Sequence, residues 1–290
     1  MKKLNSLVSV IIPCYNDDKY IEQAINSILN QTYNNVEIIV IDDGSNDKTK
    51  KVLKKIEPKV NLLITQENKG QSTARNKGIK MAKGQFILTL DSDDFFLPTF
   101  IEQAVELLKK DENIKIVTCY ANLINEKGEN KKNLIYKPLG NSISKFKFFN
   151  GALGSSMFLK KDWERIGGYD EKMNKGFEDW EFYIRILKEG GTAYVIKERL
   201  FNYRVKSEST SSRAEIVKYD LLKYIYFKHE ELYANDFKGL VNHLLSRVES
   251  QELYKKTIKN QIDFKIGKIV LKPFRLIKSI FRLKIFSLWL

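Results

Sequence analysis

Cysteine and histidine are scarce in this sequence of 290 residues, which contains only Cys14, Cys119, His229 and His243. Two cysteines cannot build the disulfide framework that stabilises small secreted domains, so a reducing compartment fits best. The two histidines are too few and too far apart for a zinc site. With 43% hydrophobic and 12% aromatic residues, the chain is expected instead to fold around an ordinary hydrophobic core.

Long hydrophobic runs are also missing. No stretch of the sequence reaches the roughly 18–20 consecutive apolar residues that a membrane-spanning helix needs. The segment MKKLNSLVSVIIPCYN has a basic start and a short apolar run, but Pro13 and polar residues follow, and no small-residue cleavage pattern is present. We therefore interpret this segment as the first core strand and not as a signal peptide.

Positive charge is abundant, with a net charge of +14, but it is unevenly distributed. Residues 255–290 hold ten Lys or Arg residues against the single Asp263, a local charge of +9. The rest of the chain is only mildly basic, so we expect no nucleic-acid partner.

Apolar runs alternate with amphipathic segments through the first 120 residues, which predicts an α/β fold with a mostly parallel sheet covered by helices on both faces. No internal repeat is visible. The strands are expected at 7–13, 36–42, 60–65, 85–90 and 114–120, and the helices near 18–31, 46–56, 71–82 and 98–110.

The second half is less regular. Residues 121–150 are polar and predict a loop with short helical pieces, followed by a strand at 155–160. Two further strands are expected at 192–197 and 200–205, and a helical pattern continues from residue 213 to the end. We therefore expect a domain at 1–212, divided into halves at 1–120 and 121–212, and a helical extension at 213–290.

Three polar clusters directly follow predicted strands: PCYN, DDGSND and DSDD. Ligands of parallel α/β sheets bind beyond the carboxyl ends of the strands, so these clusters should converge on one edge. In DSDD, carboxylates this close repel unless a cation lies between them, although a solvated acidic loop is the simpler alternative. Mg²⁺ or Mn²⁺ would suit them, because such ions complete an oxygen shell with substrate phosphates and water.

The other motifs each have a plain structural explanation beside a functional one. Gly44 with Ser45 or Asn46 can form a turn and a helix cap, which leaves Asp42 to bind the donors of a ligand such as a nucleobase. Arg75 can decorate a helix or contact a phosphate or base. Glu178 and Asp179 can be stabilised by a helix dipole or serve as a general base.

In this order the motifs resemble the inverting glycosyltransferases of family 2, which have the GT-A fold. The resemblance covers roughly residues 6–205 and is carried by VSVIIPCYN, IDDGSND, NKGQSTARNKG, LDSDDFFLP, GGYDE and FEDWEFYIRI. It implies a donor that is a nucleoside-diphosphate sugar, most simply a UDP-sugar, and a bound Mn²⁺ or Mg²⁺.

The resemblance also implies a role for each motif residue. Asp179 would be the catalytic base, with Glu178 meeting the acceptor. Asp91 and Asp93 would form the DxD element that contacts ribose, metal and diphosphate. The remaining nucleotide contacts would come from Pro13, Tyr15, Asp42, Arg75 and Ser92.

One position departs from the family pattern. Many members have a His where this chain has Lys206, and a protonated Lys cannot ligate a metal cation. Arg204 and Lys206 are therefore expected to neutralise the diphosphate directly.

The basic tail at 264–290 interleaves Lys and Arg with large apolar residues, which is typical of an amphipathic helix on an anionic membrane surface; packing on the protein body or on a partner subunit is the alternative. Together these features predict an enzyme on the cytoplasmic face of the cell membrane that extends a glycan or lipid-linked acceptor for a surface polysaccharide. An inactive scaffold of the same fold and, with less support, a sugar nucleotidyltransferase are the alternatives, and a homo-oligomer is left open.

Overall fold

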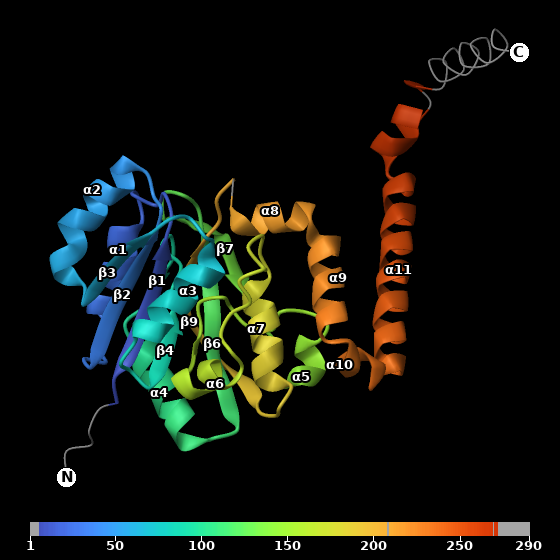
Figure 1. The fold of residues 1–290 in the computed structure, drawn as a ribbon. Helices are drawn as coiled ribbons and strands as arrows, with labels where there is room; N and C mark the ends of the chain where they lie inside the picture. Colours follow the sequence, from blue (N-terminus) through green and yellow to red (C-terminus); the bar gives the residue numbers. More distant parts are fainter. Residues whose placement is uncertain (1–5, 208, 269, 272–290) are drawn as a thin grey trace, which may run out of the picture. The chain divides into compact units, whose positions relative to one another are not determined.

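The computed structural model describes residues 6–207, 209–268 and 270–271. The chain forms two compact units, Met1–Leu232 and Tyr233–Leu290. The first unit is an α/β structure with one large sheet (Figure 1), and the α/β class predicted from the sequence is confirmed.

The N-terminal half of the sheet is parallel. β1 (Val8–Cys14) pairs with β2 (Val36–Asp43) and with β4 (Phe86–Thr89), and β2 pairs with β3 (Leu62–Gln66). The resulting order, β3-β2-β1-β4, brings the carboxyl ends of four strands to one edge. These strands lie where the apolar runs predicted them.

The other half of the sheet is mixed. β8 (Met157–Leu159) runs antiparallel between β4 and β6 (Ile114–Ile124), whereas β9 (Thr192–Arg204) runs parallel to β6. The short β5 (Phe95–Phe96) pairs antiparallel with β9 and ends the order. The return of β9 to β5 carries the residues after β9 toward the loop that follows β4.

Two predictions for the second half were wrong. The expected loop at 121–150 contains β7 (Asn130–Tyr136), which forms a hairpin with an extended β6. Its sequence NKKNLIY lacks apolar alternation, and it pairs with β6 alone. The two strands expected at 192–197 and 200–205 are the single strand β9, whose register against β6 shifts near Tyr120, so that the polar residues between the two apolar runs belong to the strand.

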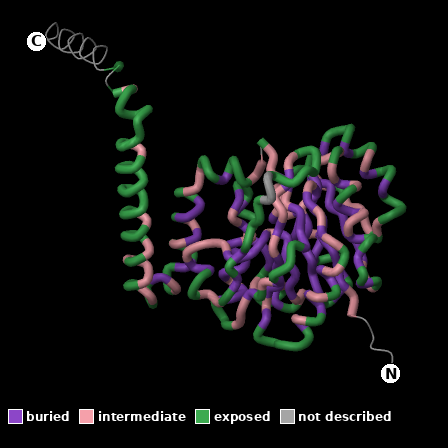
Figure 2. Tube along the Cα trace, turned by 180° about the vertical axis from the view of Figure 1, so that it is seen from behind, coloured by how far each residue is buried: buried purple, intermediate pink, exposed green. Residues whose placement is uncertain are grey.

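Helices cover both faces of the sheet because β1 is apolar on both sides. Val8, Val10 and Ile12 face one core cluster, and Ile11 faces the other. Figure 2 shows the buried residues concentrated along the strands between the helical layers of this unit. The first cluster packs α1 (Ile21–Leu29), α2 (Asp47–Ile56) and α4 (Phe100–Lys110); the second packs α3 (Gln71–Met81), α5 (Ile143–Phe146), α6 (Lys160–Arg165), α7 (Glu178–Leu187), α8 (Thr210–Ile216) and α9 (Lys218–Lys228).

The helix α3 lies unusually close to the sheet. A Cβ at Gly78 would come within 2.6 Å of Ile11 Cγ2, so glycine is needed for this approach. The helix begins after Gly70, whose φ of 85° is in the left-handed region that favours glycine. Together these glycines place Arg75 on the inner side of α3, where it is 1% exposed.

The second unit begins within α10 (Glu230–Ala234) and contains α11 (Phe237–Asn260). The Asp236 carboxylate accepts from the Gly239 N–H and caps α11. Among the described residues, no helix has the length and apolar character needed to cross a membrane. The domain boundary at 212 stays a prediction; α8 and α9 pack into the core of the first unit. Residues 272–290 of the basic tail lie outside the described residues.

Candidate active site

A cavity of about 870 Å³ opens at the carboxyl-end edge of the sheet, where the end of β2 meets the segments after β1, β3, β4 and β9. The predicted site residues divide into two groups around it. Seven of them line the cavity: Pro13, Tyr15, Asp91, Ser92, Asp93, Arg204 and Lys206. The other four do not line it: Asp42, Arg75, Glu178 and Asp179.

The loops after β1 and β2 are tied to each other. The Asn46 N–H donates to Asn16 Oδ1 over 2.8 Å, and the Asn16 N–H donates to Ser45 Oγ over 3.1 Å. Asn46 in turn caps α2 through the Thr49 N–H. These hydrogen bonds fix the loop that places Tyr15, which is 50% exposed, at the mouth of the cavity.

The two aspartates that end β2 have protein partners. Asp42 is buried, and its Oδ1 accepts from the Ser45 N–H over 2.9 Å, so the turn engages one oxygen of the carboxylate that the sequence left to a ligand. Its contact with a base stays a prediction. Asp43, which sequence reasoning passed over, lines the cavity and accepts from the main-chain N–H groups of Lys69 and Gly70.

Arg75 joins two motifs that are far apart in the sequence. Its Nη2 lies 2.5 Å from Asp91 Oδ1, and its Nη1 lies 2.5 Å from Glu178 Oε1. Burial alone would lower the pKa of the guanidinium, but the two carboxylates outweigh it and raise that pKa. Arg75 therefore links the end of the β4 segment to the start of α7. Its predicted place along the nucleotide pocket stays a prediction.

Asp179 follows in the first turn of α7. Its Oδ2 accepts from Asn150 Nδ2 over 2.8 Å, and its Oδ1 accepts from the Trp180 N–H over 2.7 Å. Burial, followed by the neighbouring Glu178 charge, raises the pKa of Asp179 to about 7, against a lowering influence from Arg75. A carboxylate with this pKa is suited to take a proton near neutral pH.

The sequence interpretation gave no role to three residues at this point. Phe177 precedes α7 with a φ of 61°, a left-handed conformation that is strained for an aromatic residue and typical of functional sites. A Cβ at Gly154 would lie 3.2 Å from Asp179 Oδ2, so glycine leaves the carboxylate room. Asn150 belongs to the region predicted as a loop, where the sequence FNGALGSS offered only its small residues as a signal.

Lys206 lies between the carboxylates of Asp93 and Asp17. Its Nζ lies 2.6 Å from Asp93 Oδ2 and 3.1 Å from Asp17 Oδ1, and the Ser92 hydroxyl donates to Asp17 Oδ2 over 2.6 Å. Burial raises the pKa of Asp93, and the nearby Lys206 opposes that rise. Sequence reasoning missed Asp17, which reaches the cluster from the loop after β1.

Arg204 has a different environment from Lys206. Its guanidinium donates to the main-chain carbonyls of Asp93, Asn125 and Glu126 and to Gln23 Oε1. Its own N–H donates to Asp94 Oδ1 over 2.7 Å, which buries Asp94 against β9. Arg204 therefore braces the loop after β4, and its predicted contact with a diphosphate stays a prediction.

The carboxylates of Asp91 and Asp93 could bind a divalent cation together with ligands from outside the protein. Within the part of the chain that the structure describes, no group of three or more His, Cys, Asp or Glu side chains is arranged to hold a metal ion. Asp91 and Asp93 each have one oxygen engaged by a protein cation. A hard cation could use the second oxygen of these residues if phosphate and water completed its shell.

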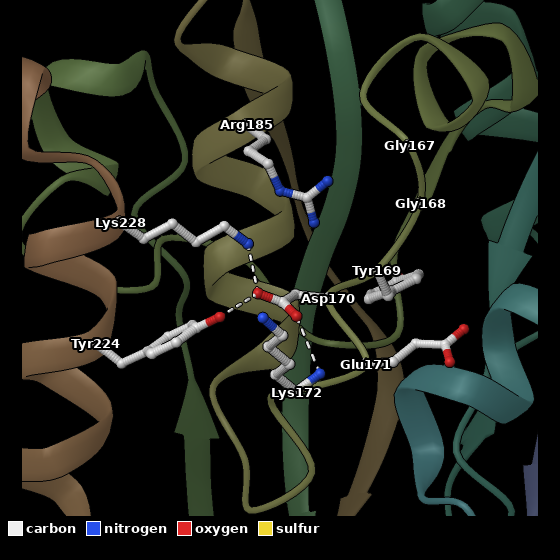
Figure 3. Close-up of a pocket in the computed structure, with 9 residues that line it drawn as sticks. All are labelled: Gly167, Gly168, Tyr169, Asp170, Glu171, Lys172, Arg185, Tyr224 and Lys228. Atoms are coloured by element: carbon white, nitrogen blue, oxygen red, sulfur yellow. Dashed lines mark hydrogen bonds and ion pairs between the residues drawn. The ribbon is translucent and has the colours of Figure 1, made fainter.

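A second cavity, of about 370 Å³, lies between the loop at 167–172, α7 and α9. Figure 3 shows Lys228 and Tyr224 reaching from α9 to the Asp170 carboxylate. The distances to Asp170 Oδ2 are 2.5 Å from Lys228 Nζ and 2.8 Å from the Tyr224 hydroxyl. Lys228 and Asp170 are thus paired with each other, which is typical of a structural network.

Comparisons with known proteins agree that this chain is similar to glycosyltransferases. The family described as "Glycosyl transferase family 2" matches residues 9–167, and "N-terminal domain of galactosyltransferase" matches residues 141–230. An uncharacterized glycosyltransferase of Haemophilus influenzae is 31% identical over 265 residues, covering 86% of this chain and 80% of that protein. The putative teichuronic acid biosynthesis glycosyltransferase TuaG of Bacillus subtilis is 29% identical over 235 residues, covering 80% of this chain and 90% of TuaG.

The solved structures support the fold. The crystal structure of residues 1–349 of S. aureus TarS in complex with UDP-GlcNAc matches with a TM-score of 0.59 at 20% identity. The match covers 71% of this chain and 60% of the TarS chain.

Proposed function

This chain belongs to glycosyl transferase family 2, and on that premise we propose that it moves a sugar from a nucleoside-diphosphate sugar to a hydroxyl of a glycan or lipid-linked acceptor, with inversion at the anomeric carbon. The observation that carries this proposal is the Arg75 bridge. It connects Asp91, at the edge of the donor cavity, to Glu178, which is next to the acidic residue Asp179. One guanidinium thereby contacts both a residue of the donor cavity and the neighbour of the proposed proton acceptor.

In the proposed reaction, Asp179 takes the proton of the acceptor hydroxyl. The acceptor oxygen forms its bond to the anomeric carbon while the bond from that carbon to the diphosphate oxygen breaks. The bonding electron pair leaves with the nucleoside diphosphate. Asn150 and the Trp180 N–H hold the two carboxylate oxygens of Asp179 in place, which favours a defined direction of proton transfer.

The donor is proposed to be a UDP-sugar. Its support is the TarS structure, which contains UDP-GlcNAc on the same fold. The cavity at the strand ends is large enough for a nucleotide-sized ligand. We propose Mn²⁺ or Mg²⁺ as the cofactor, held by Asp91 and Asp93 together with the diphosphate; when bound, the cation would supply charge neutralisation for the leaving group.

The acceptor is proposed to be a growing surface polysaccharide or its lipid-linked precursor. The likeness to TuaG, whose name assigns it to teichuronic acid biosynthesis, supports this class of acceptor.

A donor panel tests the proposed function directly. Thermal shift and sugar-nucleotide hydrolysis would be measured with UDP-, GDP- and dTDP-sugars in the presence of Mn²⁺ or Mg²⁺. We expect one nucleotide class to stabilise the protein and to be hydrolysed slowly without acceptor. If none of these donors binds with either metal, the proposal is rejected.

Attachment to the cytoplasmic face of the membrane is a further part of the proposal. In the described part of the tail, Phe264, Ile266, Val270 and Leu271 are exposed beside basic residues. Each Lys or Arg near an anionic lipid surface contributes about 1 kcal/mol, so several together support peripheral binding.

Deletion of residues 264–290 should release the protein from vesicles that contain anionic lipid. The full chain and the deletion variant would be sedimented with phosphatidylglycerol-containing and with purely phosphatidylcholine vesicles. We expect the full chain to sediment only with the anionic vesicles and the variant with neither. Equal sedimentation of both proteins would contradict membrane attachment through the tail.

A further inference from the structure

The cavity contains a cation of its own. Lys206 lies two residues beyond the end of β9, and its ammonium is held between Asp93 and Asp17, at 2.6 and 3.1 Å. It is also 5.5 Å from the centre of the Tyr20 ring, which adds a cation–π contact. Although partial burial would lower the pKa of this ammonium, the two carboxylates outweigh it and raise the pKa, so the group stays charged.

Lys206 differs from Arg75 and Arg204 because it can release a carboxylate partner and bind a phosphate instead. The Arg75 guanidinium is buried between two carboxylates, and that of Arg204 is engaged by three main-chain carbonyls and an amide. The Lys206 side chain is 20% exposed and lines the cavity. An ammonium carries three donors on a flexible stem, and two of them are used here, so it can exchange a carboxylate partner for a phosphate.

The same contact limits Asp93. The ammonium 2.6 Å away occupies Oδ2, and a divalent cation at the remaining oxygen would be repelled by that nearby positive charge. Lys206 and a metal ion therefore compete for Asp93 as long as no anion is present. A diphosphate relieves this competition, since its oxygens accept the ammonium and free the carboxylate.

We propose that Lys206 is the diphosphate-binding cation of this enzyme, that it allows a nucleoside diphosphate to bind without a divalent metal, and that it blocks Asp93 to metal until the nucleotide arrives. The proposal rests on the function proposed above. It applies to this chain because the position is Lys, whose ammonium cannot serve as a metal ligand.

The first experiment measures UDP binding by calorimetry, once in EDTA and once in Mn²⁺. If the donor panel selects another base, the diphosphate of that base replaces UDP. We expect the unaltered protein to bind UDP in EDTA with an affinity within about 10-fold of that in Mn²⁺, because a charge-assisted contact contributes about as much as one such factor. Lys206→Met should weaken binding in EDTA by about 10-fold or more, and Lys206→Arg should retain it.

Lys197→Met is the matched control. Lys197 is an exposed residue of β9, the strand that precedes Lys206, and it does not line the cavity, so the same substitution there should leave UDP binding unchanged.

The second experiment measures Mn²⁺ binding without nucleotide by electron paramagnetic resonance of the free ion. We expect weak binding to the unaltered protein and binding that is about 10-fold tighter in Lys206→Met, since removing the ammonium frees Asp93 and Asp17 for the metal. The variant therefore changes the two affinities in opposite directions. A variant that merely folds poorly would lose both.

The outcomes separate this inference from the proposed function. If nucleotides bind only when Mn²⁺ is present, or if Lys206→Met binds UDP in EDTA as the unaltered protein does, the inference is overturned while the glycosyltransferase proposal stands. Unchanged or weaker Mn²⁺ binding by Lys206→Met overturns the blocking of Asp93. If no nucleotide binds under any condition, the proposed function fails and this inference fails with it.

Discussion

Two acidic residues of α7, Asp179 and Glu181, lie less than one turn apart, yet their pKa values are shifted in opposite directions. Burial raises the pKa of Asp179 to about 7, with Glu178 adding to the rise. Glu181 is also buried, yet hydrogen bonds from His229, Arg185 and Lys228 outweigh burial and lower its pKa to about 2. The difference lies in the number of donors that face each carboxylate.

Glu181 belongs to a closed network. Its oxygens contact Arg185 at 2.7 Å, Lys228 at 2.9 Å and His229 at 3.0 Å, and Lys228 extends the network to Asp170 at the second cavity (Figure 3). Among the described residues, Asp179 accepts from an amide and a main-chain N–H and has no ion pair. A carboxylate without a direct cationic partner can accept a proton, whereas a fully paired one stabilises the fold.

The largest effect is expected at Asp179. Replacement by Asn keeps the shape of the side chain and removes the proton acceptor, so transfer should fall by about 10²–10⁴-fold. Donor binding, measured by thermal shift with the nucleotide sugar, should persist. Retained turnover would remove Asp179 as the base.

The Glu181 network should matter for stability. Glu181→Gln leaves Arg185, Lys228 and His229 without their shared counter-charge, and we expect a loss of about 3–5 kcal/mol in the free energy of unfolding. Urea denaturation measures it. Glu112→Gln, at an exposed position, is the control and should change this free energy by less than about 0.5 kcal/mol.

The same network predicts the acid sensitivity of the fold. Because the folded pKa of Glu181 is lowered from 4.5 to about 2, its contribution is present above pH 4.5 and is lost as the pH falls toward 2. Glu181→Gln should therefore flatten the decline in stability over this range. An unchanged pH dependence would contradict the paired state of Glu181.

Asn150 offers a smaller and more specific test. Its amide lowers the pKa of Asp179, so Asn150→Ala should raise that pKa and shift the pH–rate profile to higher pH. Loss of orientation should also lower kcat by about 10-fold, as expected for a single positioning hydrogen bond. Asn113→Ala, at an exposed site, should alter neither quantity. A lower kcat with an unmoved profile would assign Asn150 a merely structural role.

The smallest expected effect is the pH dependence of the unaltered enzyme. Because Asp179 must be deprotonated to accept a proton and its pKa is about 7, activity should rise as the pH passes through 7 and level off above it. Initial rates between pH 5 and 9 measure this. A flat profile across that range would mean that Asp179 is already ionised well below neutrality.

Much of the fold was predictable from local patterns. The strands β1, β2 and β4 are apolar runs that end in polar clusters, and their parallel pairing brings Tyr15, Asp91 and Asp93 to one cavity as predicted. The strand β7 was not predictable in this way, because its residues pair with β6 alone and carry no apolar alternation. The polar residues that interrupt β9 hid its continuity in the same manner.

The sequence predicted which residues lie at the site better than it predicted what each of them contacts. Asp42 was expected to bind a ligand, and the Ser45 N–H three residues later already engages one of its oxygens. Asn150 and Phe177 carried no distinctive signal, since an amide in a loop and an aromatic residue before a helix are common. Their importance comes from position: one faces Asp179, and the other takes a left-handed conformation before α7.

The amino-acid sequence by itself determined where the chain changes from strand to loop, and hence which carboxylates stand at the edge of the sheet. Those features depend on hydrophobic periodicity, which is local. Only the tertiary structure decided the partners: Arg75 meets Glu178 across 103 positions, and Lys206 meets Asp17 across 189. Such contacts depend on the packing of distant elements, and it is they that set which carboxylate is neutralised, which one titrates near pH 7, and which one Lys206 holds.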